Sequence, residues 1–186
     1  MICDEIVKSV KKLKRRYRED NLFELCRNMG IILLPQSFGT QKGAIMGFFL
    51  EQRRIKTITY NSDLSDDLQR IIVGHELGHS VLHARSGGGE KIAFHDVGLF
   101  DVSSRFEREA NLFAAEFLLD DDEVLETLAQ GGDFFSAAAI LRVPMELLDF
   151  KFRIMKWKGY ELSEPPIMAQ SNFLRDVDLI GGDDEW

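Results

Sequence analysis

A five-residue segment, His75-Glu76-Leu77-Gly78-His79, constrains this 186-residue chain more than any other part of its sequence. It has the pattern HExxH, in which the two histidines are four residues apart. Residues four apart lie on the same face of a helix, so both imidazoles can bind one ion. Neutral histidine nitrogens are good zinc ligands, and the glutamate between them can take a proton from water that the ion activates. HExxH also arises by chance in helices, so assigning His75 and His79 as ligands and Glu76 as catalytic base depends on the rest of the chain.

A third ligand is needed, because a catalytic zinc site has three protein ligands and one open position. The acidic segment 107–116 is the best source of that ligand. Its first carboxylate, Glu107, shares a helix face with Asn111 and lies beside Ala110, whose small side chain permits a close approach to the histidine helix. Asn111 can also hydrogen-bond the second nitrogen of a ligating histidine. We therefore expect Glu107 to bind the ion and Asn111 to support a histidine.

Two alternatives to Glu107 as the third ligand stay open. The residues Ser104-x-x-Glu107 form a capping-box pattern, in which the glutamate only reaches back to the start of its own helix. Glu109 is the second carboxylate candidate. It shares its helix face with Arg105 and Glu116, and we expect that face to be solvated and salt-bridged.

Three other side chains are weaker candidates for a role at the site. His83 lies eight residues beyond His75, about 12 Å along a helix, so it cannot share an ion with His75. We expect it to be a buried, hydrogen-bonded histidine at the helix end. His95 lies in the loop between the two ligand helices and is a candidate for the catalytic cleft, although a single loop histidine is more often at the surface. Tyr60, at the end of a predicted hairpin, is a candidate for steadying an oxyanion.

The composition indicates a soluble, cytoplasmic protein with a substantial core. The chain is 45% hydrophobic, and its net charge of −8 argues against nucleic acid as a direct partner. A basic run over 8–18 follows an amphipathic pattern, so we expect a solvated helix face there. Cys3 and Cys26 lack metal-ligand spacing and are expected to be reduced thiols. No apolar run approaches the ~18 residues that span a bilayer, so no membrane partner is expected.

Hydrophobic periodicity and turn residues predict an α+β organisation. The predicted elements are a helix that ends near Asp20-Asn21, a helix over 22–29, a strand over 31–34 closed by Pro35, a hairpin of strands over 44–50 and 55–60, the histidine helix over 66–83, a helix over 104–119, and short helices beyond Asp120.

The residues around these segments resemble the ImmA/IrrE family of metallopeptidases. The resemblance covers roughly residues 20 to 120 and extends more weakly to 157. HELGH alone is common among zinc peptidases, but together with the second ligand segment it is fairly specific. The matching residues are Tyr60-Asn61-Ser62-x-Leu64, Ile71-x-x-x-His75-Glu76-Leu77-Gly78-His79-x-x-Leu82-His83, and Glu107-x-x-Ala110-Asn111-x-Phe113-Ala114-Ala115-x-x-Leu118.

The resemblance implies a compact zincin-like (minigluzincin) domain, with a small three-stranded sheet beside the HExxH helix and a second ligand helix. It makes His75, His79 and Glu107 the zinc ligands and Glu76 the catalytic base. We assign this domain to 1–130, a packed helical pair to 131–160 and a loosely ordered tail to 161–186. One departure is that family members often continue Leu-Leu-Met-Pro where this chain reads Leu118-Leu119-Asp120-Asp121, which changes the exit from the ligand helix and no ligand.

Two functions follow from the resemblance and the sequence. The first is a cytosolic zinc endopeptidase that cleaves a helix-turn-helix repressor and so de-represses a mobile-element or stress-response operon. The second is a metal-containing binding module that acts on the repressor, or on DNA, without proteolysis. The segment 136–156 loosely resembles a helix-turn-helix, although two packing helices joined at Val143-Pro144 explain it as well. The basic residues of its second helix and just beyond it are Lys151, Arg153, Lys156 and Lys158.

Overall fold

The structure is a computed structural model that describes residues 2–83, 92–94, 104–130, 133–172 and 174, with the backbone alone for 92–94 and 104. The predicted α+β class is confirmed. The elements in chain order are α1 (Ile2–Tyr17), α2 (Leu22–Asn28), β1 (Ile31–Gln36), β2 (Gly47–Gln52), β3 (Ile55–Asn61), α3 (Asp66–Leu82), β4 (Ile92–Phe94), α4 (Ser104–Leu118), α5 (Asp121–Ala129), α6 (Phe134–Ile140) and α7 (Met145–Lys158).

The sheet has four strands in the order β1-β3-β2-β4, one more than predicted. β1 runs parallel to β3, while β2 is antiparallel to both β3 and β4. The predicted β2–β3 hairpin is present and turns at Arg53 and Arg54, which have φ values of 50° and 67°; two positive values are typical of a tight hairpin turn. β1 continues through Pro35 instead of stopping before it, because an edge strand tolerates a residue that lacks an N–H donor.

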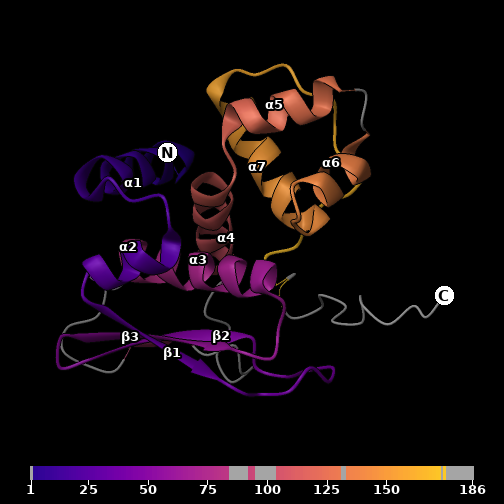
Figure 1. Cartoon of the computed structure of the whole chain (residues 1–186). Helices are drawn as coiled ribbons and strands as arrows, with labels where there is room; N and C mark the ends of the chain where they lie inside the picture. The colour runs from indigo at the N-terminus through magenta and orange to yellow at the C-terminus, as the bar shows by residue number, and fades with distance from the viewer. Residues whose placement is uncertain (1, 84–91, 95–103, 131–132, 173, 175–186) are drawn as a thin grey trace.

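Helix α3 lies between the sheet and α4 (Figure 1), so that most of its surface is covered. Its first turn is capped by Ser65, whose hydroxyl accepts a hydrogen bond from the backbone of Leu68. All ten residues from Ile71 to Ser80 are buried. A helix that is covered on all sides belongs to the interior of a protein. The two histidines of the HExxH segment are therefore in the core, where polar groups need partners.

Helices α3 and α4 approach closely because small residues line their contact. A Cβ atom placed on Gly78 would lie 3.0 Å from the Cα of Ala110 and 3.2 Å from its carbonyl oxygen. Such contacts are tighter than almost all real Cβ contacts, so a larger residue at this position would push the two helix backbones apart by a few tenths of an ångström. The predicted role of Ala110 in permitting the approach agrees with this packing. The close crossing puts the first turn of α4 over the histidines.

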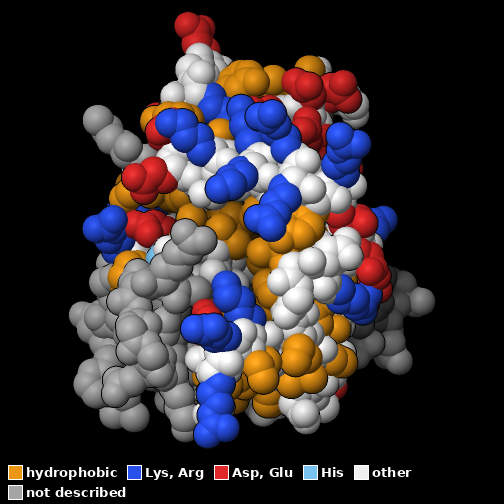
Figure 2. Space-filling view, turned by 90° about the vertical axis from the view of Figure 1, so that its left-hand side faces the viewer, with side chains coloured by type: hydrophobic (Ala, Val, Ile, Leu, Met, Phe, Trp, Pro, Cys, Tyr) orange, Lys and Arg blue, Asp and Glu red, His pale blue; other side chains and the backbone are white. Residues whose placement is uncertain are grey.

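Helix α1 packs on α4 with one face and presents the other to solvent. Ile6, Val7 and Val10 are buried on the inner face. Lys and Arg side chains gather on the face of the molecule that carries α1 (Figure 2), in agreement with the predicted solvated helix face. The helix ends at Tyr17, before the predicted Asp20-Asn21, and Arg18 follows with a φ of 51°. The exposed basic residues in this part of the chain are Lys8, Lys11, Lys12, Arg15, Arg16 and Arg18.

The main hydrophobic core takes residues from all three predicted parts of the chain. Leu147, Phe150 and Ile154 of α7 join it, and so do Ala169 and Leu174 from the segment beyond α7. The boundaries at 130 and 160 stay a prediction, but they do not separate independent cores. Within the described residues, no helix combines the length and apolar character needed to cross a membrane.

Candidate metal centre

Three side chains from two helices converge on one point in the interior. His75 and His79 project from α3 with their Nε2 atoms 3.0 Å apart. Glu107 comes from the first turn of α4, with one carboxylate oxygen 3.2 Å from Nε2 of His75 and the other 3.4 Å from Nε2 of His79. Among the described residues, these three form the group of histidine, cysteine and acidic side chains that could hold a metal ion.

The donor set fits a divalent cation such as zinc. Ligands that lie about 2.0–2.2 Å from a tetrahedral zinc ion are separated from each other by roughly 3.3–3.6 Å. The three distances between donor groups are 3.0, 3.2 and 3.4 Å, so a small adjustment would accommodate the ion. Two imidazoles and one carboxylate are a combination that zinc accepts, and three ligands leave its fourth position open.

The second nitrogen of His75 is held by Asn111. His75 Nδ1 lies 2.7 Å from Oδ1 of Asn111, and the amide nitrogen of Asn111 donates to the carbonyl oxygen of Ser171 at 2.7 Å. Because the amide group already donates to Ser171, its oxygen accepts from His75 Nδ1–H. That tautomer leaves the lone pair on Nε2, the atom that faces Glu107 and His79. This is the contact expected for Asn111 from its position one turn after Glu107.

The second nitrogen of His79 is held by a chain of two residues. His79 Nδ1 lies 3.1 Å from Nδ1 of His83, and His83 Nε2 lies 3.0 Å from a carboxylate oxygen of Glu109. The carboxylate accepts from His83 Nε2–H, so Nδ1 of a neutral His83 accepts from His79 Nδ1–H. In their neutral forms, both candidate histidine ligands thus direct an Nε2 lone pair at the site. His83 is the buried, hydrogen-bonded histidine that its position at the end of the helix predicted.

The expectation that Glu109 and Glu116 belong to a solvated face is wrong. The side chain of Glu109 is 12% exposed and bonds both Arg105 and His83. The side chain of Glu116 is 6% exposed, because α7 covers it. Helical spacing correctly put Arg105 and Glu109 on one face, but it gave no information on what packs against that face. Glu109 consequently acts through His83 and does not contact the group of His75, His79 and Glu107 directly.

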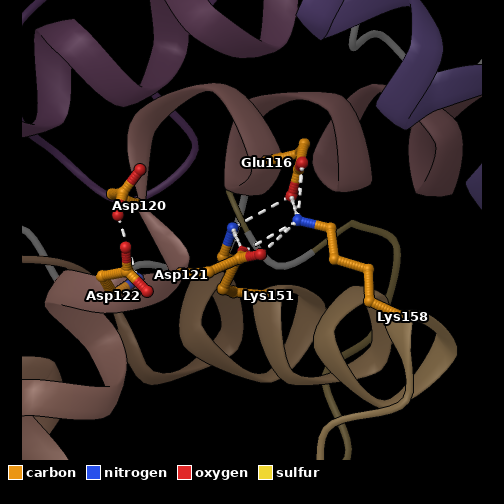
Figure 3. A network of polar contacts seen from close by, with 6 residues as sticks. All are labelled: Glu116, Asp120, Asp121, Asp122, Lys151 and Lys158. Atoms are coloured by element: carbon orange, nitrogen blue, oxygen red, sulfur yellow. Dashed lines mark hydrogen bonds and ion pairs between the residues drawn. The ribbon is translucent and has the colours of Figure 1, made fainter.

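Glu116 belongs to a second buried polar cluster at the opposite end of α4 (Figure 3). Lys151 and Lys158 of α7 both bond Glu116 and also pair with Asp121, at distances of 2.6–2.9 Å. Asp121 is one of the residues at which this chain departs from the Leu-Leu-Met-Pro pattern of the family it resembles. Its carboxylate supplies the second negative charge for the two lysines. The departure from the family pattern at Asp121 therefore completes an ion cluster of four residues.

The charges around the metal group set its protonation. Burial lowers the pKa of an imidazole, but at His75 the hydrogen bond and charge of Glu107, together with Glu76, outweigh it and raise the pKa to about 9. At His79 burial dominates and lowers the pKa to about 4. Burial opposes ionisation of Glu107, yet the two histidines hold its pKa well below the usual range. Below pH 9 the protein groups alone therefore hold a second proton on His75, at Nε2, which a cation must displace.

Glu76 and the metal group line one small cavity. Its volume is about 20 Å³, and its wall includes Met46, Gly47 and Ile72 on one side. Glu76 is buried beside the three converging ligands but is not one of them. A proton acceptor for a reacting water has to lie in such a position. The rest of the wall comes from Ser171, Asn172 and Leu174. Sequence reasoning missed these three residues, because the segment beyond 160 has no periodic pattern.

The remaining predicted residues lie elsewhere. The structure does not bring Tyr60 into the described lining of the cavity: its ring packs edge-on against Phe23 with the ring centres 5.7 Å apart. His95 lies outside the described residues, as does the side chain of Ser104. The carboxylate of Glu107 faces both histidines. This arrangement favours the ligand role of Glu107 over the capping-box alternative.

Comparisons with known proteins cover this region. A sequence profile of the IrrE N-terminal-like domain, a peptidase domain, matches residues 26–153. A protein of Bacillus phage phi105 named "Uncharacterized immunity region protein 2" is 32% identical over 143 residues, which are 77% of this chain and 86% of the phage protein. "Metallopeptidase ImmA" of Bacillus subtilis strain 168 is 27% identical over 146 residues, which are 76% of this chain and 80% of that protein. The profile spans α3 and α4 completely.

Proposed function

The chain belongs to the IrrE N-terminal-like family of peptidases, and from this premise we propose that it is a zinc-dependent endopeptidase that cleaves a helix-turn-helix repressor in the cytoplasm. The observation that carries the proposal is the convergence of two imidazole nitrogens and one carboxylate beside a buried glutamate. His75, His79 and Glu107 are the proposed ligands, and Glu76 is the proposed base. A family match alone would support a metallopeptidase but not these roles.

Each residue has a defined task in the proposed reaction. Zinc, when bound, supplies Lewis-acid activation of a water molecule and of a peptide carbonyl. Glu76 accepts the proton of the attacking water at its carboxylate and can return it to the leaving nitrogen. Asn111 and His83 hold the two imidazoles in the tautomer that directs Nε2 at the site. The apolar side chains of Met46 and Ile72 limit the access of bulk water to Glu76.

The proposed substrate class rests on the relatives and on the family. One relative carries the name of an immunity region protein and the other that of a metallopeptidase. A phage immunity region controls the expression of phage genes, so a peptidase there is expected to act on the repressor that keeps those genes silent. Such a repressor binds DNA in the cytoplasm, and the proposal puts the peptidase in the same compartment.

The binding-module alternative has less support. α6 and α7 have the helix-turn-helix outline expected from 136–156, but the basic residues of the second helix are used within the protein. Lys151 and Lys158 pair with Glu116 and Asp121, and Arg153 pairs with Asp149. Side chains engaged in this way do not form the free basic surface that phosphate contacts require. A glutamate in the cavity beside the ligands also favours catalysis over binding alone.

A single substitution separates catalysis from binding. Glu76→Gln removes the proton acceptor and leaves the three proposed ligands, so zinc content and repressor binding should persist. A positioned general base is typically worth 10²–10⁴-fold in rate, and we expect a loss near the upper end of that range. The measurement is the cleavage rate of a purified candidate helix-turn-helix repressor, together with a pull-down of the uncleaved complex.

The matched control is Glu126→Gln, the same change at an exposed position on α5, which should behave as the wild type. If Glu76→Gln relieves repression in cells as well as the wild-type protein does, the protein acts by binding and the peptidase proposal is wrong. If neither the wild type nor Glu76→Gln binds or cleaves the repressor, but the wild type hydrolyses denatured casein faster than Glu76→Gln does, the peptidase reaction is supported and the proposed substrate class is wrong.

A further inference from the structure

The chain beyond α7 returns to the metal centre and closes it. After α7 ends at Lys158, residues 159–172 run back along α7 and α4, and Ser171, Asn172 and Leu174 form part of the wall around the ligands. Leu174 is only 8% exposed and belongs to the main core. The carbonyl oxygen of Ser171 accepts from Asn111, the residue that holds His75. This segment is thus tied directly to the support of a proposed ligand.

The segment is held through its main chain. Asp149 of α7 accepts from the backbone N–H of Ala169 at 2.9 Å, and Arg153 donates to the carbonyl oxygen of the same residue at 3.0 Å. With Asn111 and Ser171, three protein side chains therefore bond three backbone groups of one non-helical stretch, two on Ala169 and one on Ser171. Contacts of this kind do not depend on the side chains of the bound strand, and a peptidase needs such contacts to bind an extended substrate.

The space left around the ligands excludes a substrate. A cavity of about 20 Å³ has room for roughly one water molecule, whereas an endopeptidase has to admit a chain that continues on both sides of the scissile bond. Of the described wall, α3, α4 and the residues at the start of β2 supply one part, and Ser171, Asn172 and Leu174 supply the rest. A peptide bound across the ligands would take the place of these three residues.

We propose that residues 169–172, together with Leu174, are an internal competitor that occupies the peptide-binding cleft, and that Asn111, Asp149 and Arg153 recognise the backbone of the substrate once the segment leaves. The inference rests on the proposed peptidase function. The segment lies beyond residues 26–153, the part that matches the family profile, so it adds control to a family domain.

The test loosens the segment in the full-length chain. Leu174→Asn removes its apolar anchor in the core. Leu162→Asn is the matched control, because Leu162 is in the same segment but packs on the second hydrophobic cluster around α5–α7. Each protein is loaded with zinc, and the rate at which 1,10-phenanthroline removes the metal is measured. We expect removal to be at least 10-fold faster for Leu174→Asn and unchanged for Leu162→Asn.

The second measurement is competition in trans. Hydrolysis of denatured casein should be at least 10-fold faster with Leu174→Asn than with the wild type. A synthetic peptide of residues 165–174, which supplies the proposed occupant in trans, should inhibit the variant competitively, and a scrambled peptide should not. Leu174→Ala, a milder loss of the same anchor, should show the same changes to a smaller degree and serves if Leu174→Asn does not fold.

The outcomes distinguish this inference from the function on which it rests. If zinc removal and casein hydrolysis are no faster in either Leu174 variant than in the wild type, the segment does not block the site, even where the wild type cleaves a repressor. Equal acceleration by Leu162→Asn also overturns the inference, because the effect would then reflect general loosening. If Leu174→Asn releases zinc faster but no variant hydrolyses casein or a repressor, the segment does cover the site and the peptidase proposal fails.

Discussion

Helix α4 carries two carboxylates, half-buried Glu107 and buried Glu116, that differ in their neighbours. Glu107, in the first turn, faces two imidazoles of α3, whereas Glu116, in the last turns, faces two ammonium groups of α7. Glu116 contacts two positively charged groups, and Glu107 contacts two groups that become positively charged when they are protonated. The group at Glu107 also borders a cavity, while the cluster at Glu116 has two acids and two lysines that balance each other (Figure 3).

The comparison shows that the partner, and not the buried acid, decides what a site can do. A lysine ammonium has three donors and no lone pair, so the Glu116 cluster can only be a closed set of ion pairs. A neutral imidazole has a lone pair, and two of them beside one carboxylate form a donor set that a cation can complete. The Glu116 cluster therefore stabilises the packing of α7 on α4, and the Glu107 group is available for chemistry.

The largest expected effect is that of Glu107→Gln on zinc affinity. Zinc binding by a complete set of ligands is worth roughly 10–16 kcal/mol, so losing one charged ligand should cost about 4 kcal/mol, or about 10³-fold in affinity. Peptide hydrolysis should become undetectable, and the metal-free fold should keep most of its stability above pH 9, where His75 is neutral with or without Glu107. Competition with a chromophoric chelator measures the affinity. Full zinc affinity in this variant would show that Glu107 is not a ligand.

The same substitution at Glu116 should have the opposite pattern. Glu116→Gln leaves two buried lysines with one carboxylate, and breaking a buried ion pair typically costs about 3–5 kcal/mol of stability. We expect a loss near 3 kcal/mol, because Asp121 still pairs with both lysines. Zinc affinity should not change. Urea denaturation of the metal-free protein measures the loss, and a stability equal to that of Glu107→Gln would remove the distinction between the two clusters.

Contacts that are local in the sequence were predictable. The spacing of His75 and His79 put them on one face of a helix, and the spacing of Glu107 and Asn111 put the carboxylate and its neighbouring amide together on the next ligand helix. Both patterns depend only on the period of one helix. The packing of the two helices through Ala110 also followed from side-chain size. These features account for the ligands and the nearest support of His75.

Contacts that depend on distant parts of the chain were not predictable. Glu116 was expected at the surface because its own helix does not reveal that Lys151, 35 residues later, covers it. Glu109 was misplaced for the same reason, since His83 reaches it from α3. β4 is three residues long and exists only because the edge of β2 is available for pairing. Leu174 lies in a stretch without periodicity, so no sequence pattern connected it with the site.

Glu109→Gln should have an intermediate effect on zinc affinity. The carboxylate orients His83, which in turn orients His79, and loss of such an outer contact typically costs about 10–100-fold in metal affinity. A glutamine still accepts from His83, so we expect a loss near 10-fold. His83→Ala, which breaks the chain at its centre, should approach 100-fold. Unchanged zinc affinity in both variants would mean that His79 is held in place by helix packing alone.

The remaining expected effect, about tenfold for each pH unit, is a difference in pH dependence between the two clusters. At the Glu107 group, the pKa of His75 is raised to about 9 from an unfolded value of 6.5. The proton on His75 therefore stabilises the metal-free protein fully below pH 6.5, and this stabilisation is lost as the pH rises through 9. Zinc has to displace the same proton. Its affinity should consequently rise about tenfold per pH unit between 6.5 and 9, in the direction opposite to metal-free stability.

The Glu116 cluster should not respond over this range. The lysines lower the pKa of Asp121 despite its burial, and the two carboxylates raise the pKa of Lys158, so both groups keep their charges between pH 6.5 and 9. Chelator competition and urea denaturation at half-unit steps of pH measure the two slopes. In Glu107→Gln the pKa of His75 is no longer raised by its main cause, so the free energy of unfolding of the metal-free protein should no longer depend on pH between 6.5 and 9. In Glu116→Gln this pH dependence should remain. A flat zinc affinity in the wild type would show that His75 is already neutral, and the two clusters would then differ in their ligands but not in their protons.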